Sequence, residues 1–229
     1  QVVRRQRQMC IRDSLFPLLI PRLKNTKANF SDSTVKLLYL PNENNQLTYT
    51  HFYSKDFYQL DLISSIENIV SSSNQYDFGT SNHTLRWLHG FENSTNLVGT
   101  LVHSSYLPKN LFPEIDSSNI IQFESQIQYT SAQFEYKDKR KDEFDYYAGV
   151  QINQYNINPG SLDPGSGNSI IPVDLNNEKS QEFSFFTNLN WKLTKRLSVS
   201  SGIRITHFSL LGPYDQGTYN KDGFFEGVN

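Results

Sequence analysis

The chain has 229 residues, enough for one or two ordinary domains, and only 37% of them are hydrophobic. Aromatic residues nevertheless reach 14%, with 16 Phe and 13 Tyr, which favours strands that have one apolar and one wet face. The formal charge of −2 offers no basic surface for nucleic acid, and a single cysteine, Cys10, excludes an internal disulfide framework and a cysteine-rich metal site.

The first fourteen residues differ from the rest. Arg4 to Ser14 reads RRQRQMCIRDS, which resembles translated sequencing-adapter sequence of the kind found in metagenomic assemblies. We interpret residues 1–14 as an artefact and exclude them from fold reasoning. Because no secretory signal segment is present and Asn229 follows a Gly-rich and Tyr-rich stretch, we expect the natural protein to continue beyond both ends.

Two hairpins with irregular alternation of apolar and polar residues are predicted in the first half of the chain. Their strands and turns are residues 34–40, 41–45 and 47–58 for the first, and 84–88, 92–96 and 97–106 for the second.

A third hairpin has a long first strand, residues 121–136, with apolar residues at every second position. The alternation changes phase near Tyr129 to Ser131, which predicts a β-bulge there. A charged turn at 137–142 leads to the partner strand around 146–152.

The fourth hairpin shows the clearest period of two. Residues 183–193 and 197–205 each place apolar residues at alternate positions, and Thr194 to Arg196 form a short turn between them.

The connections alternate between short and long. The short turns lie between the two strands of each hairpin, whereas long polar stretches follow at about 63–80, 107–118, 156–179 and beyond 211. Outer-membrane barrels have this pattern, with short periplasmic turns and longer extracellular loops.

No apolar run approaches the roughly 20 residues of a transmembrane helix, so strands would have to cross the membrane. The pattern predicts an all-β protein, an antiparallel up-and-down transmembrane β-barrel, present as an open partial barrel of about eight strands.

Several segments resemble the barrel of TonB-dependent outer-membrane receptors. They are Ile20-Pro21-Arg22, Asn25-Thr26-Lys27, Tyr49-Thr50-His51-Phe52-Tyr53-Ser54-Lys55-Asp56, Tyr155-Asn156-Ile157-Asn158-Pro159-Gly160, Gly202-Ile203-Arg204-Ile205-Thr206-His207-Phe208 and Gly212-Pro213-Tyr214. The resemblance covers residues 15–229.

The resemblance implies a barrel of 22 strands, closed by a plug domain, that imports siderophores, vitamins, glycans or peptides with energy delivered by TonB. Residues 15–229 would be a partial barrel, about a third of the whole, located in the cell outer membrane. The implied partners are the lipid bilayer, TonB through a plug domain that this chain lacks, and a ligand at the extracellular loops, with no nucleic acid and no cofactor.

Aromatic residues near the predicted strand ends would either stack on a ligand in the lumen or form the interfacial girdle of a barrel, and the girdle is the preferred interpretation. They are Tyr53, Tyr106, Phe134, Tyr136, Tyr146, Trp191 and Phe208.

Other candidate sites are weak. His83, His89 and His103 lack metal-ligand spacing, and the loop Pro164 to Ser169 lacks the Lys-Ser/Thr ending of a phosphate loop. Asn220, Asp222 and Glu226 around Gly223 do not fit a calcium loop. We therefore assign no catalytic, cofactor-binding or metal residue.

An enzyme is not expected, because no Gly-x-Ser-x-Gly elbow or other nucleophile setting occurs. The mixed charges of Lys137 to Glu143 suit a solvated turn, and the sequons at Asn82 and Asn93 have no meaning in a bacterial protein.

Two other interpretations stay open. A passive porin or small complete barrel requires the first strand, near Thr34, to pair with the last, near Ile203. A soluble β-sandwich for binding or adhesion requires two facing sheets with a shared dry core.

Overall fold

The computed structural model describes residues 27–60, 64–66, 69–71, 73–92, 94–115, 119–141, 143–166, 170–212, 217–219 and 225–228. Residues 1–14, interpreted above as an artefact, lie outside the described residues. So do the first two segments of the family resemblance, Ile20-Pro21-Arg22 and Asn25-Thr26-Lys27, apart from Lys27.

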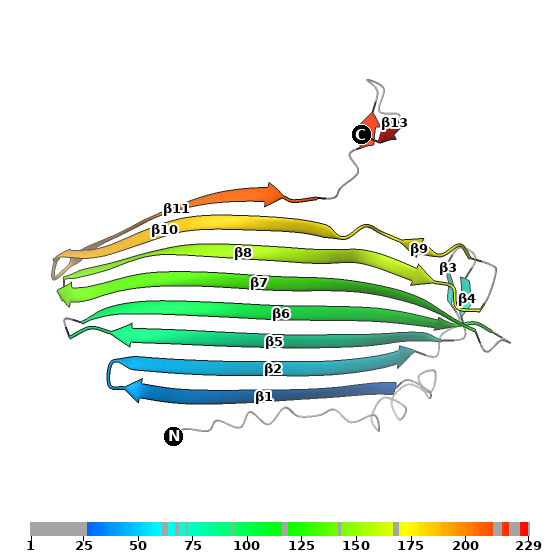
Figure 1. The fold of residues 1–229 in the computed structure, drawn as a ribbon, viewed down its shortest axis with the longest axis horizontal. Coiled ribbons are helices and arrows are strands. Elements are labelled where there is room, and N and C mark those ends of the chain that lie inside the picture. Colours follow the sequence, from blue (N-terminus) through cyan, green and yellow to red (C-terminus); the bar gives the residue numbers. More distant parts are fainter. Residues whose placement is uncertain are drawn as a thin grey trace.

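Eight long antiparallel strands, 14 to 22 residues each, make one sheet (Figure 1). They are β1 (Lys27–Asn42), β2 (Asn45–Leu60), β5 (Asn74–Gly90), β6 (Thr95–Pro113), β7 (Ile120–Lys141), β8 (Phe144–Asp163), β10 (Glu178–Thr194) and β11 (Leu197–Leu210). Their order in the sheet is their order in the chain, and the short β9 (Val173–Asp174) adds to β8. The prediction of an all-β, up-and-down, open sheet is confirmed.

Four short strands make two small hairpins outside this sheet. They are β3 (Ser64–Ile66) with β4 (Ile69–Ser71), and β12 (Gly217–Tyr219) with β13 (Phe225–Val228).

The four hairpin turns all lie at one end of the sheet, on the left of Figure 1, and the longer connections lie at the other end. Here these are called the turn end and the loop end. The strands extend further than predicted, because residues 74–80, 107–113, 156–163 and 178–179 are paired in strands rather than in loops. Apolar side chains no longer keep to one face there, since Tyr76 and Phe78 lie on one face and Leu107 lies on the other, so the hydropathy period that reveals a half-buried strand is lost.

The predicted bulge at Tyr129 to Ser131 is wrong. These three residues pair in unbroken register with Tyr155, Gln154 and Asn153. The register shifts instead between Glu124 and Gln126, opposite the segment of β8 that contains Pro159 and Gly160. Pro159 has no N–H to donate to the ladder, which explains an irregularity at this place. Along β7 the apolar side chains change face: Ile127 and its partner Tyr106 lie on one face of the sheet, whereas Ala132 and Phe134 lie on the other. The change of phase in the sequence reflects this change of face, since the backbone pairing is unbroken there.

The two faces of the sheet differ in exposure. Directly paired residues share a face, so Leu101, Ala132 and Ile152 lie on one face, and Val102, Ser131 and Asn153 lie on the other. On the first face Leu101, Phe134 and Phe183 remain 50%, 49% and 47% exposed, whereas on the second Ser131, Asn153 and Ser184 are only 4%, 5% and 0% exposed. Side chains crowd one another on the inside of a curved sheet, so the second face is the concave face and the first is the convex face.

The sandwich interpretation is not borne out, because among the described residues the two remaining sheets are two-stranded hairpins, too small to cover the apolar convex face. The pairing of first and last strands is not formed either: β1 pairs with β2 alone and β11 with β10 alone in this part of the chain. The described residues include no helix with the length and hydropathy needed for a membrane span.

Candidate functional site: a polar strip and an aromatic cluster on the concave face

The concave face carries a strip of hydrogen-bonded polar residues midway along the strands. Residues at alternate positions of a strand share a face, and direct pairing aligns the polar ones of β7, β8, β10 and β11 across the strands. The polar strip comprises Ser131, Gln151, Asn153, Glu182, Ser184, Arg204 and Thr206.

Arg204 is the centre of this strip. Its Nη2 donates to Ser184 Oγ at 3.0 Å and to Gln151 Oε1 at 3.0 Å, and lies 3.4 Å from Glu182 Oε1. Ser184, fully buried, in turn donates to Glu182 Oε1 at 2.9 Å. The guanidinium also lies over the ring of Phe186, 5.6 Å from the ring centre. Arg204 is therefore held in one orientation by contacts with β10 and with β8, the next strand beyond it.

Asn153 organises the adjoining part of the strip. Its Oδ1 accepts hydrogen bonds from Tyr129 Oη at 3.0 Å and from Ser131 Oγ at 2.8 Å. Gln151 Nε2 donates to the same Ser131 hydroxyl at 3.4 Å, which links Asn153 to Arg204. Shared partners of this kind fix the orientation of the side chains, so the strip is a preorganised polar surface.

Nearer the loop end, the concave face carries four stacked rings, here called the aromatic cluster. Tyr58 and Tyr76 are directly paired, and the cluster continues through Phe78 to Tyr106 with ring centres 6.2 to 6.5 Å apart. Tyr58 and Tyr106, at the two ends, are 39% and 37% exposed. Exposed rings offer flat apolar surface and hydroxyl groups to a planar or sugar-like ligand.

The aromatic residues singled out in the sequence are divided between the faces. Tyr53, Phe134, Tyr136, Tyr146 and Trp191 lie on the convex face, where the girdle interpretation remains a prediction. Tyr106 and Phe208 lie on the concave face, so they cannot belong to a girdle.

The histidines singled out in the sequence lie in two places on the convex face. His83 and His103 are directly paired, and His51 completes a row across three strands, its ring stacked on His83 at 4.4 Å. His89 lies near the turn end against Phe91. Within the described residues, no group of three or more His, Cys, Asp or Glu is arranged to hold a metal ion.

The two loop candidates are only partly described. In the loop Pro164 to Ser169, the first three residues are held by Asn119, whose Nδ2 donates to Pro164 O at 2.9 Å and whose Oδ1 accepts from Ser166 N at 2.7 Å. The strand β9, not a helix, is the next element described after it. Asn220, Asp222 and Gly223 lie outside the described residues, as does the side chain of Glu226.

Sequence reasoning missed the polar strip as a site. Gln151, Glu182 and Ser184 are ordinary residues within their own strands, and their contacts with Arg204 depend on the register between strands. The one signal in the sequence was that these residues alternate along each strand with residues of the apolar face.

No family model and no curated protein matches the chain. Solved structures similar to it include a chain in the FpvAI–pyocin S2 complex, with a TM-score of 0.60, and Pseudomonas aeruginosa FpvA bound to heterologous pyoverdines, with a TM-score of 0.63. Each is 12% identical and covers 89% of this chain, whereas this chain covers 32% of each. The likeness shows the fold: the chain spans about a third of the length of these outer-membrane barrel receptors.

Proposed function

We propose that residues 15–229 are part of the barrel of a TonB-dependent outer-membrane receptor that takes up a scarce ligand, such as a siderophore, vitamin, glycan or peptide. The fold likeness to FpvA, which binds pyoverdines in one of the matched structures, supports this proposal. The observation that carries it is the exposed apolar convex face.

The convex face has the length and chemistry of a lipid-facing surface. On β10 its apolar residues run from Phe183 to Leu193, eleven positions, which matches the roughly 9 to 11 residues of a strand that crosses a bilayer at a tilt. Neighbouring strands continue the band with Phe134, Val150 and Ile203, which are 49%, 38% and 62% exposed. A water-soluble protein rarely exposes so continuous an apolar surface.

The orientation follows from the connections. Short turns are periplasmic and long loops extracellular in outer-membrane barrels. The aromatic cluster would then lie inside the barrel near its outer mouth, where an arriving ligand meets it. The polar strip would face the plug domain, which we expect another part of the receptor to supply and through which TonB would act.

Lipid contact is testable with the two tryptophans of the chain, because Trp87 and Trp191 are both on the convex face. The full chain is refolded into phosphatidylcholine vesicles with and without brominated acyl chains. We expect brominated lipid to quench most of the fluorescence and aqueous acrylamide to quench little of it. A Trp191→Phe variant isolates Trp87. Efficient quenching by acrylamide with none by brominated lipid would refute the membrane assignment.

A further inference from the structure

A carboxylate lies among the rings of the aromatic cluster. Asp56 is paired directly with Phe78 on one neighbouring strand and with Phe30 on the other, so the three side chains share the concave face. Tyr58 follows Asp56 by two residues on the same face. Asp56 is exposed, and Phe30 is 54% exposed. A group that reaches the Asp56 carboxylate therefore also meets aromatic surface.

A second carboxylate, Asp32, lies close to the first. Asp32 is exposed and is paired with Ser54, which precedes Asp56 by two residues on the same face. The two aspartates are thus diagonal neighbours on adjacent strands, about 7 to 8 Å apart. Ser54 donates to Asp56 Oδ1 at 3.4 Å, and within the described part of the chain neither aspartate forms an ion pair. Both carboxylates are therefore open to a cationic partner.

These residues together are here called the acidic aromatic patch. It comprises Phe30, Asp32, Asp56, Tyr58, Tyr76, Phe78 and Tyr106.

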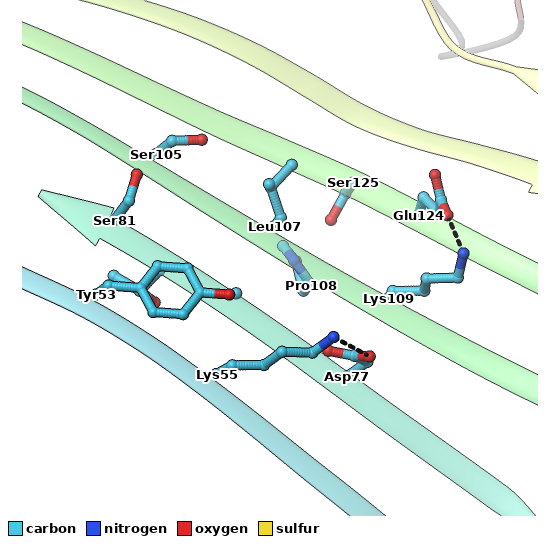
Figure 2. Close-up of a pocket in the computed structure, with 12 residues that line it drawn as sticks. Tyr53, Lys55, Asp77, Ser81, Ser105, Leu107, Pro108, Lys109, Glu124 and Ser125 are labelled. Atoms are coloured by element: carbon cyan, nitrogen blue, oxygen red, sulfur yellow. Dashed lines mark ion pairs between the residues drawn. The ribbon is translucent and has the colours of Figure 1, made fainter. Parts of the chain in front are cut away.

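The acidic aromatic patch has no lysine or arginine beside it on the concave face. Among the described residues of the long strands, the nearest on this face is Lys36, four residues from Asp32 along β1, a backbone distance of about 13 Å. Salt screens most of the attraction over such a distance. Lys55 and Lys109 lie on the convex face, where each forms an ion pair with a carboxylate of a neighbouring strand (Figure 2). The charge of the two aspartates is thus not balanced on their own face.

This combination selects a ligand by its charge. The faces of aromatic rings carry negative partial charge, so rings and carboxylates both attract a cation. A planar guanidinium stacks on a ring and donates to a carboxylate at the same time. A phosphate or carboxylate group would be repelled by every element of the patch. A neutral sugar also stacks on rings and donates to carboxylates, but it gains nothing from a surface without cations.

We propose that the acidic aromatic patch binds a guanidinium or ammonium group of the ligand that the receptor takes up. The inference rests on the proposed function, which places the concave face inside a barrel and the loop end at its outer mouth. It narrows the ligands proposed there to those that present positive charge, as a basic peptide does.

The first test compares two peptides that differ only in charge. Tri-arginine amide is the probe, and tri-citrulline amide, in which a neutral urea replaces each guanidinium, is its matched control. Binding to the full chain in micelles of a nonionic detergent is measured by isothermal titration calorimetry in dilute buffer. We expect the citrulline peptide to bind at least about tenfold more weakly, because it keeps only neutral hydrogen bonds. Equal binding of the two peptides would overturn the proposal.

The second test removes the carboxylates. Asp32→Asn, Asp56→Asn keeps the shape of both exposed side chains, and we expect it to bind tri-arginine at least about fivefold more weakly. The control, Glu43→Gln, Glu143→Gln, removes the same charge from two exposed positions in turns at the other end of the sheet. It should bind within about twofold of the unaltered chain. Equal weakening in both double variants would show attraction to net charge alone and would refute the patch.

The rings are tested by Tyr58→Leu, Tyr106→Leu, which keeps apolar surface but removes two aromatic faces. We expect binding of tri-arginine to fall about threefold to tenfold, with binding of tri-citrulline nearly unchanged. Equal losses for the two peptides would contradict a cation on the rings. Tryptophan quenching by brominated lipid reports separately on the proposed function. Quenching without binding of tri-arginine refutes the patch alone, and intact binding without quenching refutes the membrane assignment alone.

Discussion

The ring of Phe186 lies directly over Gly149 on the neighbouring strand. The two residues are paired in register, and a Cβ at position 149 would lie 2.6 Å from Phe186 Cζ and 2.6 Å from the carbonyl oxygen of Phe134. The absence of a side chain at 149 thus allows the ring to lie flat against the sheet, beneath the guanidinium of Arg204.

Replacing this glycine should destabilise the sheet. Gly149→Ala places a methyl group against both a ring and a backbone oxygen, and the oxygen cannot move without disturbing the ladder. We expect a loss of about 1 to 3 kcal/mol in the free energy of unfolding, measured by urea titration of the vesicle-inserted chain. Gly79→Ala is the control, since its Cβ would meet Leu107 at an ordinary 3.8 Å. Equal midpoints for the two variants would contradict the packing described.

Removing the centre of the polar strip should have a smaller effect. Arg204→Ala removes one donor from Gln151 and one from Glu182, which keeps the hydroxyl of Ser184. Arg204 is also 48% exposed, so water replaces part of what is lost. We expect a loss of about 1 kcal/mol, with Arg204→Lys restoring only part of it because one ammonium cannot reproduce the planar set of contacts. A double-mutant cycle with Glu182→Gln measures the coupling, and full restoration by lysine would show that charge alone matters.

Adjacent residues on opposite faces should respond differently to a positive charge. Phe134→Arg places a guanidinium in the lipid-facing band and should cost about 2 to 4 kcal/mol in a bilayer. Gln133→Arg adds the same group on the concave face, beside Glu135, and should cost little. Phe134 is already 49% exposed, so in a soluble protein both variants would be nearly neutral. Unfolding titrations in vesicles distinguish these cases.

The orientation across the membrane can be read by cysteine labelling. In the intact receptor, a Leu175→Cys label site lies between β9 and β10 at the loop end, and a Glu43→Cys site lies in the turn between β1 and β2. A membrane-impermeant maleimide should label position 175 on intact cells and position 43 only after the outer membrane is permeabilised. The reverse pattern would invert the proposed orientation.

The hairpins were predictable because one face of each strand is apolar over the membrane-length band. In β10 and β11, the alternation of apolar and polar residues located both strands and the turn between them, although β10 begins five residues earlier and β11 ends five residues later than predicted. Near the loop end this contrast disappears: Tyr76 and Phe78 lie on the concave face while Lys55 and Asp77 lie on the convex face. Hydropathy there predicts a loop, although backbone pairing continues.

The candidate sites could not be predicted for a related reason. Arg204 and Gln151 are 53 residues apart and meet only because three strands are in a particular register. A shift of two residues in any ladder would keep the faces but separate these side chains, and no local signal in the sequence fixes that choice. The row formed by His51, His83 and His103 depends on register in the same way.

Strand order that follows chain order has a consequence for how such a wall changes in evolution. Among the described residues, every long strand pairs with the long strands before and after it in the chain, and β8 also pairs with the short β9. Duplication or deletion of a whole hairpin therefore leaves the register of all remaining strand pairs unchanged. It changes the circumference of the barrel wall but not the side chains of any surface patch that remains. Gain or loss of a single strand lacks this property, because it would reverse the direction of every strand that follows in the chain.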